Sequence, residues 1–467
     1  MGQTARRLTP EVSARHRFGA ELRRRRLARG LSQDSLGRLV HVSGDLLAKL
    51  EKAQRWPAHD VAARCDAILQ AGGALMQMLP AVDTERARQG MAHADNAMQF
   101  AHPALVGADG RHTISLPEGP LFAATSIDAW LVPEARPVGS SMRVQQPTYG
   151  CVRPGDLFVV NGHGAFYATE ARRRRQPDGY LTIPQAYVVD DFSVALLWAT
   201  RALDDALHED DQPLAEGLDH LRRLKPGRSS ANAVSDKLTD TGQGWLGSYA
   251  CASFIDAHLH AVGGPPSFWT REQRGQEAAT WLLFSHKFNY LRTLRNRFGG
   301  ATTTSMVRVF CIPDPALGPR SERVLLLLAA ALMESMGVAV HVCGEPDYTD
   351  VEGFVLSPTG GVIVANWLRA GRVWHGDVVD SGAQVTRYRE AIGFGVTRSL
   401  IAADTAAGRL RNLAEYTDVD WRWLTVRAAQ IASAGVEGFV RPRSRLLGSA
   451  GIQAACEFLA QQRPPAS

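Results

Sequence analysis

The stretch ELRRRRLARGLSQDSLGRLVHVSGDLLAKLE, residues 21–51, contains three helix-forming segments separated by two short breaks. Arg29-Gly30 closes the first segment, and the hydroxyl of Ser32 can cap a second helix over residues 33–41. Ser43 then offers the same kind of cap to a third helix. We therefore expect three helices in close succession.

Apolar side chains recur at helical spacing within this stretch and on either side of it. Thr9-Pro10-Glu11 favours a helix start, and Gly72-Gly73 favours the end of a later helix. Residues 1–80 are thus predicted to form an all-α bundle of four or five helices, in which Gly37 permits close approach of a neighbour. The expected apolar positions are Phe18, Leu22, Leu27, Leu36, Leu39, Val40, Leu47, Leu50, Val61, Ala62, Cys65, Ile68 and Leu69.

The positive charge of the chain is concentrated in this bundle. The chain of 467 residues has a net charge of +5, whereas residues 1–80 carry fourteen Lys or Arg against seven Asp or Glu, or +7. Such a local patch is the footprint of a nucleic-acid-binding module, because it neutralises phosphates and releases counterions. The face of the third helix that turns away from the core can enter a groove, and it comprises Gly44, Asp45, Ala48, Lys49 and Lys52.

The spacing of these signals is similar to that of a known family. With Arg29-Gly30-Leu31-Ser32-Gln33, Val42-Ser43 and Leu50-Glu51, residues 15–80 resemble the Cro/cI (XRE-type) helix-turn-helix domain. The resemblance implies that helix two positions the domain and that helix three reads bases. It implies a phosphate contact for Gln33, base contacts for Asp45 and Lys49, and phosphate contacts for Lys52 and Arg55. The DNA-binding set is Gln33, Ser43, Gly44, Asp45, Ala48, Lys49, Lys52 and Arg55.

Three further positions are interpreted against this family. Gly44 stands where a reading side chain is common, which removes one base contact. Ala53 stands where Gly is usual, so a left-handed turn after helix three is less favoured. Arg26 and Glu51 match a buried ion pair of the family and are interpreted as structural.

The remaining chain is predicted to be a large α/β (α+β) regulatory region, which makes the protein multidomain. Its predicted parts are a linker (81–119), a β-rich subdomain (120–240) with a mostly antiparallel sheet, and an α/β domain (241–467). The expected strands begin at Phe122, Ala129, Leu157, Ala165 and Tyr187, and the four-Arg run at residues 172–175 is expected in a hairpin loop.

The α/β domain contains the most regular pattern. A strand at Val307–Ile312, an apolar helix over 321–336 and a strand over 337–342 predict a parallel βαβ unit. A hairpin is expected around residues 354–366. Segments 193–224 and 267–298 look helical, the second with a capping box at Thr270-Arg-Glu-Gln273.

Residues 275–400 weakly resemble a degenerate phospholipase-D-like domain. The chain lacks the His-x-Lys-x4-Asp motif that phosphodiester chemistry requires there, so this resemblance implies a fold and no activity. We expect no enzyme activity.

Other signals argue against metals, cofactors and membranes. Asp256-Ala-His258-Leu-His260 has a metal-binding appearance, but it lies in a helical pattern that points the two rings in different directions. The six cysteines form no CxxC pair and indicate reduced thiols. The longest apolar run, Val324–Met333, is too short to cross a membrane. We expect a cytoplasmic protein with no metal and no cofactor.

These observations predict a bacterial-type, sequence-specific transcriptional regulator that binds double-stranded DNA as a homodimer. Its C-terminal region would sense a small-molecule or protein effector, or mediate oligomerisation. Two alternatives remain open at this point: a C-terminal enzyme of phosphodiesterase or hydrolase type, and a protein-interaction scaffold, each addressed to DNA by the N-terminal domain.

Overall fold

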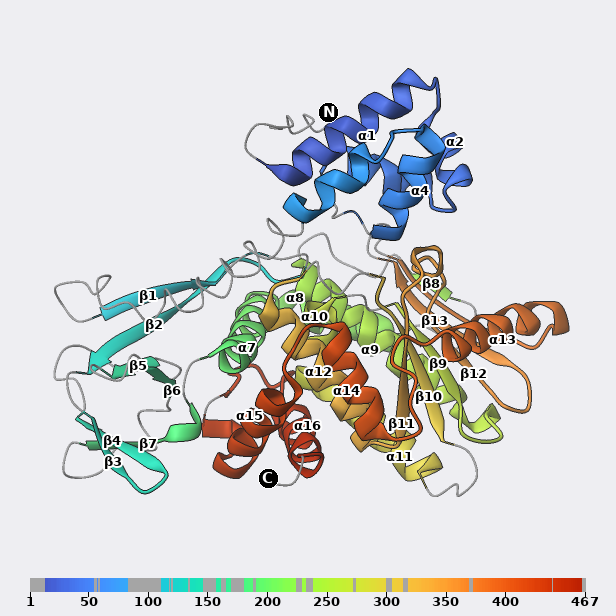
Figure 1. The fold of residues 1–467 in the computed structure, drawn as a ribbon. Helices are drawn as coiled ribbons and strands as arrows, with labels where there is room; N and C mark the ends of the chain where they lie inside the picture. The colour runs from blue at the N-terminus through green and yellow to red at the C-terminus, as the bar shows by residue number, and fades with distance from the viewer. Residues whose placement is uncertain are drawn as a thin grey trace. The chain divides into compact units, whose positions relative to one another are not determined.

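The computed structural model describes residues 13–53, 57, 59–82, 111–116, 118, 121–132, 135–145, 157–160, 165–168, 180–187, 190–223, 229–231, 238–271, 274–299, 305–313, 318–368, 373–438 and 440–463. The chain divides into two compact units, residues 1–96 and residues 97–467 (Figure 1). Each unit has a hydrophobic core of its own.

The N-terminal unit is helical throughout its described residues. It contains α1 (Ala14–Ala28), α2 (Gln33–Leu39), α3 (Gly44–Glu51) and α4 (His59–Leu69), and residues 74–82 are also helical. The predicted caps are confirmed, because Ser32 accepts a hydrogen bond from the Ser35 amide at 3.0 Å and Ser43 accepts one from the Leu46 amide at 3.1 Å. Helix α2 ends at Leu39, earlier than expected, since His41 has a φ of 57° that cannot continue a helix.

The start of α1 differs in part from the expectation. The side chain of Ser13 caps the described helix by accepting a hydrogen bond from the His16 amide at 3.2 Å. The predicted start at Thr9-Pro10 lies outside the described residues.

The buried stripe of these helices follows a spacing of four residues. Phe18 and Leu22 of α1, Leu36 of α2 and Val40 directly after α2 are all at most 1 % exposed. Three positions expected in the core are instead exposed, namely Leu27 (58 %), Leu39 (48 %) and Ile68 (38 %). Each lies beside the four-residue stripe rather than on it, so its side chain leaves the helix on another face.

Close backbone contacts lock the three helices together. A Cβ atom on Gly37 would lie 2.6 Å from the Val42 carbonyl oxygen, and one on Gly19 would lie 2.5 Å from the Leu50 carbonyl oxygen. The close approach predicted at Gly37 is therefore confirmed. After α3, Ala53 takes the left-handed conformation (φ 53°) that its side chain disfavours, so the doubt about this turn was wrong.

The predicted buried ion pair is also confirmed. Arg26 donates to both carboxylate oxygens of Glu51, from Nε at 2.5 Å and from a terminal nitrogen at 2.9 Å, and its other terminal nitrogen donates to the Leu31 carbonyl at 2.7 Å. Arg26 is 7 % exposed and Glu51 is 2 % exposed. This single pair connects the last turn of α1 to the end of α3.

The C-terminal unit is built on a mixed seven-stranded sheet with the order β11-β10-β9-β12-β13-β14-β8. Its strands are β8 (Ser229–Ala231), β9 (Ser267–Thr270), β10 (Met306–Cys311), β11 (Val338–Cys343), β12 (Phe354–Leu356), β13 (Val362–Leu368) and β14 (Val373–Val379). Strands β9, β10 and β11 are parallel, and α12 (Arg320–Ser335) joins β10 to β11. The predicted βαβ unit and the β12–β13 hairpin are confirmed.

Helices cover both faces of this sheet (Figure 1). On one face lie α9 (Asp240–His258), α10 (Gly275–Leu283), α11 (Ser285–Phe298) and α12, which is buried over most of its length. On the other face, α13 (Gly382–Thr397) packs so closely that a Cβ on Gly395 would meet Val309 at 2.7 Å. The chain continues with α14 (Ala406–Tyr416), α15 (Trp421–Ala434) and α16 (Ala450–Gln461).

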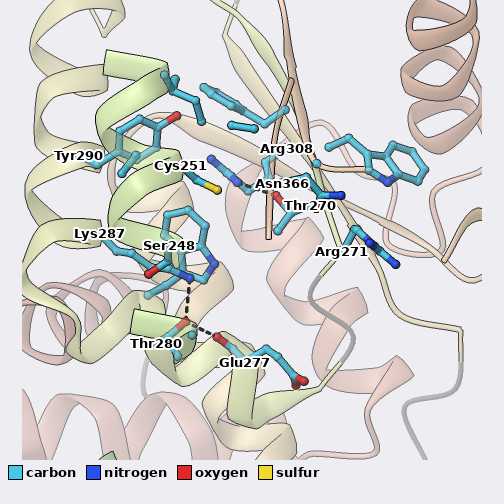
Figure 2. A pocket seen from close by; sticks show the side chains of 18 of the residues that line it. Ser248, Cys251, Thr270, Arg271, Glu277, Thr280, Lys287, Tyr290, Arg308 and Asn366 are labelled. Atoms are coloured by element: carbon cyan, nitrogen blue, oxygen red, sulfur yellow. Dashed lines mark hydrogen bonds between the residues drawn. The ribbon is translucent and has the colours of Figure 1, made fainter. Parts of the chain in front are cut away.

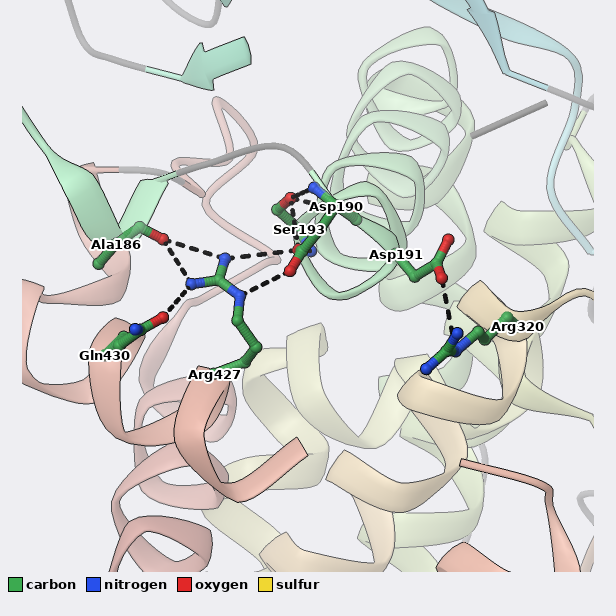
Figure 3. A network of polar contacts seen from close by, with 7 residues as sticks. All are labelled: Ala186, Asp190, Asp191, Ser193, Arg320, Arg427 and Gln430. Carbon is green, nitrogen blue, oxygen red and sulfur yellow. Dashed lines mark hydrogen bonds and ion pairs between the residues drawn. The ribbon is translucent and has the colours of Figure 1, made fainter. Parts of the chain in front are cut away.

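A polar network fixes the first turn of α7 (Asp191–Glu209) against two later helices (Figure 3). Asp190 caps α7, and Arg427 of α15 donates to its carboxylate at 2.7 Å while also contacting the Ala186 carbonyl at 3.1 Å. Asp191 pairs with Arg320 at the start of α12 at 3.4 Å. Residues more than two hundred positions apart are thereby held in one unit.

Two predicted helices in this unit are broken. Residues 193–224 were expected as one helix, but the chain interrupts at Asp210 between α7 and α8 (Asp211–Arg223). Residues 267–298 begin as strand β9, so the capping box at Thr270 is wrong: its hydroxyl accepts a hydrogen bond from Arg308 within the sheet. Phe284 has extended backbone and separates α10 from α11.

The β-rich part contains two further sheets, which confirms a mostly antiparallel arrangement. One has the order β1-β2-β5-β6, from strands Arg111–Leu116, Thr125–Val132, Leu157–Val160 and Ala165–Ala168. The other has the order β3-β4-β7, from strands Ala135–Val138, Ser141–Gln145 and Tyr180–Pro184. Strand β1 lies inside the segment expected to be a linker.

At two positions where strands were expected to begin, Phe122 and Tyr187, the described residues have another conformation. Phe122 lies outside any strand and packs edge-on against Trp198, with the two ring centroids 5.1 Å apart. Tyr187 belongs to a short 3-10 helix, Gln185–Tyr187. Their aromatic rings are used for core packing rather than for strand pairing. The four-Arg run at 172–175 lies outside the described residues, and the finer division of residues 120–467 stays a prediction.

The first prediction concerns the buried ion pair. Replacing Arg26 by Met leaves Glu51 buried without its cation, which costs about 3 kcal/mol. We expect amide hydrogen exchange in α1, α2 and α3 of the full chain, measured by mass spectrometry, to accelerate about a hundredfold. The control is Arg24→Ala, which breaks an exposed pair with Glu21. Exchange that is equal in the two variants would contradict the structural role of the pair.

Candidate nucleic-acid interface

The outward face of α3 is the part of the N-terminal unit that can enter a groove. Leu47 and Leu50 are buried, whereas Lys49 and Lys52 are exposed and Ala48 is half-buried. The structure therefore confirms that the two lysines lie outside the core, one turn or less apart, with Lys49 in the last turn of α3 and Lys52 at its C-cap. Asp45 lies in α3, but its side chain and the whole of Arg55 lie outside the described residues.

The first turn of α3 is shaped by a contact from α2. A Cβ atom on Gly44 would lie 1.9 Å from the Asp34 Oδ1 atom, so the carboxylate of Asp34 occupies the space of a side chain at position 44. The sequence indicated only that a base contact was missing there. The structure shows that Gly44 admits an acidic group to the N-terminal end of α3, where the helix dipole favours negative charge.

Two of the predicted phosphate or cap residues have internal partners. The Gln33 side-chain nitrogen donates to Glu51 at 2.7 Å, which extends the Arg26–Glu51 pair onto α2. The Ser43 hydroxyl serves as the cap of α3. Both residues thus orient the helices of the motif, and their contacts to DNA stay predictions.

A hollow of about 340 Å³ lies between the three helices and presents positive charge. Arg26 and Glu51 at its base compensate each other, while Arg23 and Lys52 are exposed at its edge. Its lining comprises Arg23, Arg26, Ser32, Gln33, Glu51 and Lys52. A cationic hollow of this kind can accept a phosphate group of a nucleic-acid backbone.

Arg23 was not among the residues predicted to contact DNA. In the run Arg23–Arg26, Arg24 and Arg25 pair with Glu21 at 2.5 and 2.8 Å, and Arg26 pairs with Glu51. The hydrogen bond from Arg24 is the main reason that the pKa of Glu21 falls to about 2. Among the described residues no carboxylate pairs with Arg23. Its position three residues before Arg26, on the same helix face, was the signal that could have identified it.

Comparison with known proteins identifies the type of domain at the N-terminus. Residues 17–79 match a family described as a helix-turn-helix domain. The N-terminal segment is a DNA-binding helix-turn-helix domain, and it precedes an α/β region. The match does not extend to residues 275–400, so the phospholipase-D-like resemblance stays a prediction. Comparison with curated proteins and with solved structures finds no match to the chain.

The His258-x-His260 motif shows a different geometry from the expected one. Helix α9 ends at His258 and a 3-10 turn follows, so the two rings lie 6.4 Å apart and nearly parallel instead of pointing in opposite directions. The Nδ1 atoms of His258 and His260 contact the backbone carbonyls of Phe254 and Ala257, both in α9. Within the described ranges, no three His, Cys, Asp or Glu side chains are grouped as metal ligands, and no helix is long and apolar enough to cross a membrane.

A second prediction tests the newly identified cation. We expect Arg23→Ala in the full chain to weaken binding to any duplex and to reduce the slope of log affinity against log salt by about 0.9. Fluorescence anisotropy across a salt series measures this slope. Arg24→Ala, which removes a neighbouring arginine already paired with Glu21, provides the control. An unchanged slope for Arg23→Ala would remove Arg23 from the interface.

Proposed function

We propose that this protein is a sequence-specific transcriptional regulator. The observation that carries the proposal is the arrangement of α2 and α3, in which an exposed helix face with two lysines stands beside a cationic hollow. Phosphate contacts at the hollow would fix the position of the domain, and α3 would contact base edges in the major groove. The C-terminal unit would regulate DNA binding and perform no catalysis.

The side chains of this interface divide into readers and anchors. Lys49, in the last turn of α3, would donate to guanine, and Asp45 would accept from a cytosine amino group. Lys52 and Arg23 at the edge of the hollow, together with Arg55, would hold phosphates. Only the readers distinguish one base pair from another. Loss of a reader should therefore change the sequence preference, whereas loss of an anchor should weaken binding to every sequence.

The third prediction compares two lysines of the same helix. We expect Lys49→Ala to relax base preference at one position of a selected site, with a loss of about 1–3 kcal/mol on the preferred base. Lys52→Ala should instead weaken all sequences alike. Selection of duplexes from a random pool, followed by sequencing and affinity measurement, separates the two effects. Equal losses on every sequence for both variants would contradict the assignment of reader and anchor.

A fourth prediction concerns assembly. One short recognition helix makes few base contacts, so useful specificity requires two copies reading half-sites about 34 Å apart or at a multiple of that distance. We expect sedimentation of the full chain with a selected duplex to show two protomers per DNA. A stoichiometry of one protomer per site at saturation would exclude the dimeric arrangement.

A further inference from the structure

Two cysteines that lie far apart in the sequence end neighbouring strands of the central sheet. Cys311 is the last residue of β10 and Cys343 is the last residue of β11, and the two are direct register partners in a parallel pair. The Ile312 amide donates to the Cys343 carbonyl at 2.9 Å, which holds the register at this point. Neither cysteine belongs to a local sequence motif, so only the sheet brings the two thiols together.

The separation of the two positions suits a covalent link. Neighbouring strands lie about 4.8 Å apart, and the Cα atoms of a disulfide are about 4.4–6.8 Å apart. Both side chains belong to one apolar cluster on the face of the sheet that α13 covers, so the thiols leave their strands in the same direction. Both are free thiols in the structure.

The two thiols differ in their hydrogen bonds and in their acidity. A hydrogen bond from the Cys311 thiol, together with one from the Glu345 amide, lowers the pKa of the Cys343 thiol against the opposing effect of burial. The same bond between the cysteines, together with burial, raises the pKa of the Cys311 thiol. Because the thiolate is the reactive form of cysteine, Cys343 is the nucleophile of the pair and Cys311 is the thiol that reacts second.

The pair lies close below the surface of the C-terminal unit. Cys311 and Cys343 are at most 1 % exposed, whereas Gly344 is half-buried and Glu345 is exposed. The two cysteines stand at the carboxyl ends of their strands rather than in the middle of the sheet. A small oxidant therefore needs a local opening of the segment that follows β11, and the sheet can stay folded.

We propose that Cys311 and Cys343 form a reversible redox site, in which a hydroperoxide oxidises the two thiols to a disulfide between β10 and β11. The Cys343 thiolate attacks one peroxide oxygen and the O–O bond breaks, which leaves a sulfenic acid on Cys343 and releases an alcohol or water. The Cys311 sulfur then attacks the Cys343 sulfur, and the S–O bond breaks. The hydroxyl group leaves as water with the proton of Cys311. Two thiols thus give two electrons and two protons to one peroxide.

The geometry makes such a disulfide easy to reduce. The Cβ atoms of a disulfide are about 3.8 Å apart, so β10 and β11 would have to approach each other by about 1 Å at this point. A strained disulfide is reduced more readily than a relaxed one, and a small dithiol should therefore restore both thiols. This site is independent of the proposed DNA function.

The test uses the full chain after reduction and removal of the reductant. Hydrogen peroxide is added to the folded protein until at least one cysteine is oxidised, the remaining thiols are alkylated, and unreduced peptides are mapped by mass spectrometry. We expect a disulfide that joins the peptides of Cys311 and Cys343 and that disappears after dithiothreitol. Recovery of both residues as alkylated thiols, while another cysteine is oxidised, would overturn the proposal.

Cys251 provides the comparison, because it is more exposed than the other cysteines among the described residues. Figure 2 shows Cys251 on α9 beside a cavity, and it is the one cysteine among the residues that line this cavity. We expect Cys251 to be oxidised without joining the pair, and Cys251→Ala to leave the disulfide of Cys311 and Cys343 unchanged. A disulfide from Cys251 to either residue would contradict the assignment of the pair.

Two variants distinguish the nucleophile from its partner. In Cys311→Ala the sulfenic acid of Cys343 has no neighbouring thiol, so dimedone, which labels sulfenic acids, should label Cys343 in this variant and not in the unchanged chain. In Cys343→Ala, Cys311 should stay a thiol at the same peroxide dose. Circular dichroism establishes that both variants are folded. Dimedone labelling of Cys311 in folded Cys343→Ala, with none of Cys343 in folded Cys311→Ala, would overturn the assigned roles.

Discussion

The N-terminal domain depends on one buried ion pair, between Arg26 in the last turn of α1 and Glu51 at the end of α3. The pair also receives Gln33 of α2, so three helices meet at two carboxylate oxygens. A buried charge pair tolerates little displacement, because breaking it leaves an uncompensated charge. It therefore fixes the angle at which α3 leaves the bundle and holds the outward lysines in place. The cationic hollow exists because Glu51 neutralises only one of the three cations around it.

The C-terminal unit also contains an ion pair that joins its helices. Arg427 and Asp190 form a compensated pair that joins distant helices, in the manner of Arg26 and Glu51. Lys287 and Arg308 are held by hydroxyl groups and aromatic rings around a cavity of small-molecule size.

Local signals predicted the helix-turn-helix domain well, because its caps, breaks and apolar spacing all act within a few residues. Ser32, Ser43, Gly37 and the Arg26–Glu51 pair have the predicted roles. Long-range pairing was harder to predict. Ser267–Thr270 has no helical or strand signal stronger than that of its neighbours, and it becomes a strand because β10 and β12 pair with it on both sides.

Contacts between elements that are distant in the sequence could not be predicted from local patterns. Arg23 was missed because a run of four arginines does not indicate which guanidinium groups are paired. The structure shows that Arg24 and Arg25 are the ones that pair with Glu21. The residues that line a cavity of about 570 Å³ in the C-terminal unit come from α9, α10, α11, β9, β10, β12 and β13, and only the tertiary fold brings them together. Asp34 beside Gly44 is likewise a contact between two helices that neither helix predicts alone.

The central claim is that the outward face of α3 meets DNA. A photoreactive amino acid introduced at Ala48, which is half-buried between Lys49 and the core, tests this directly in the full chain, with the exposed position Gln77 as the comparison. The account predicts efficient, salt-sensitive cross-linking to duplex DNA from position 48 and little from position 77. The absence of cross-linking from position 48 under conditions in which the protein binds DNA would contradict it.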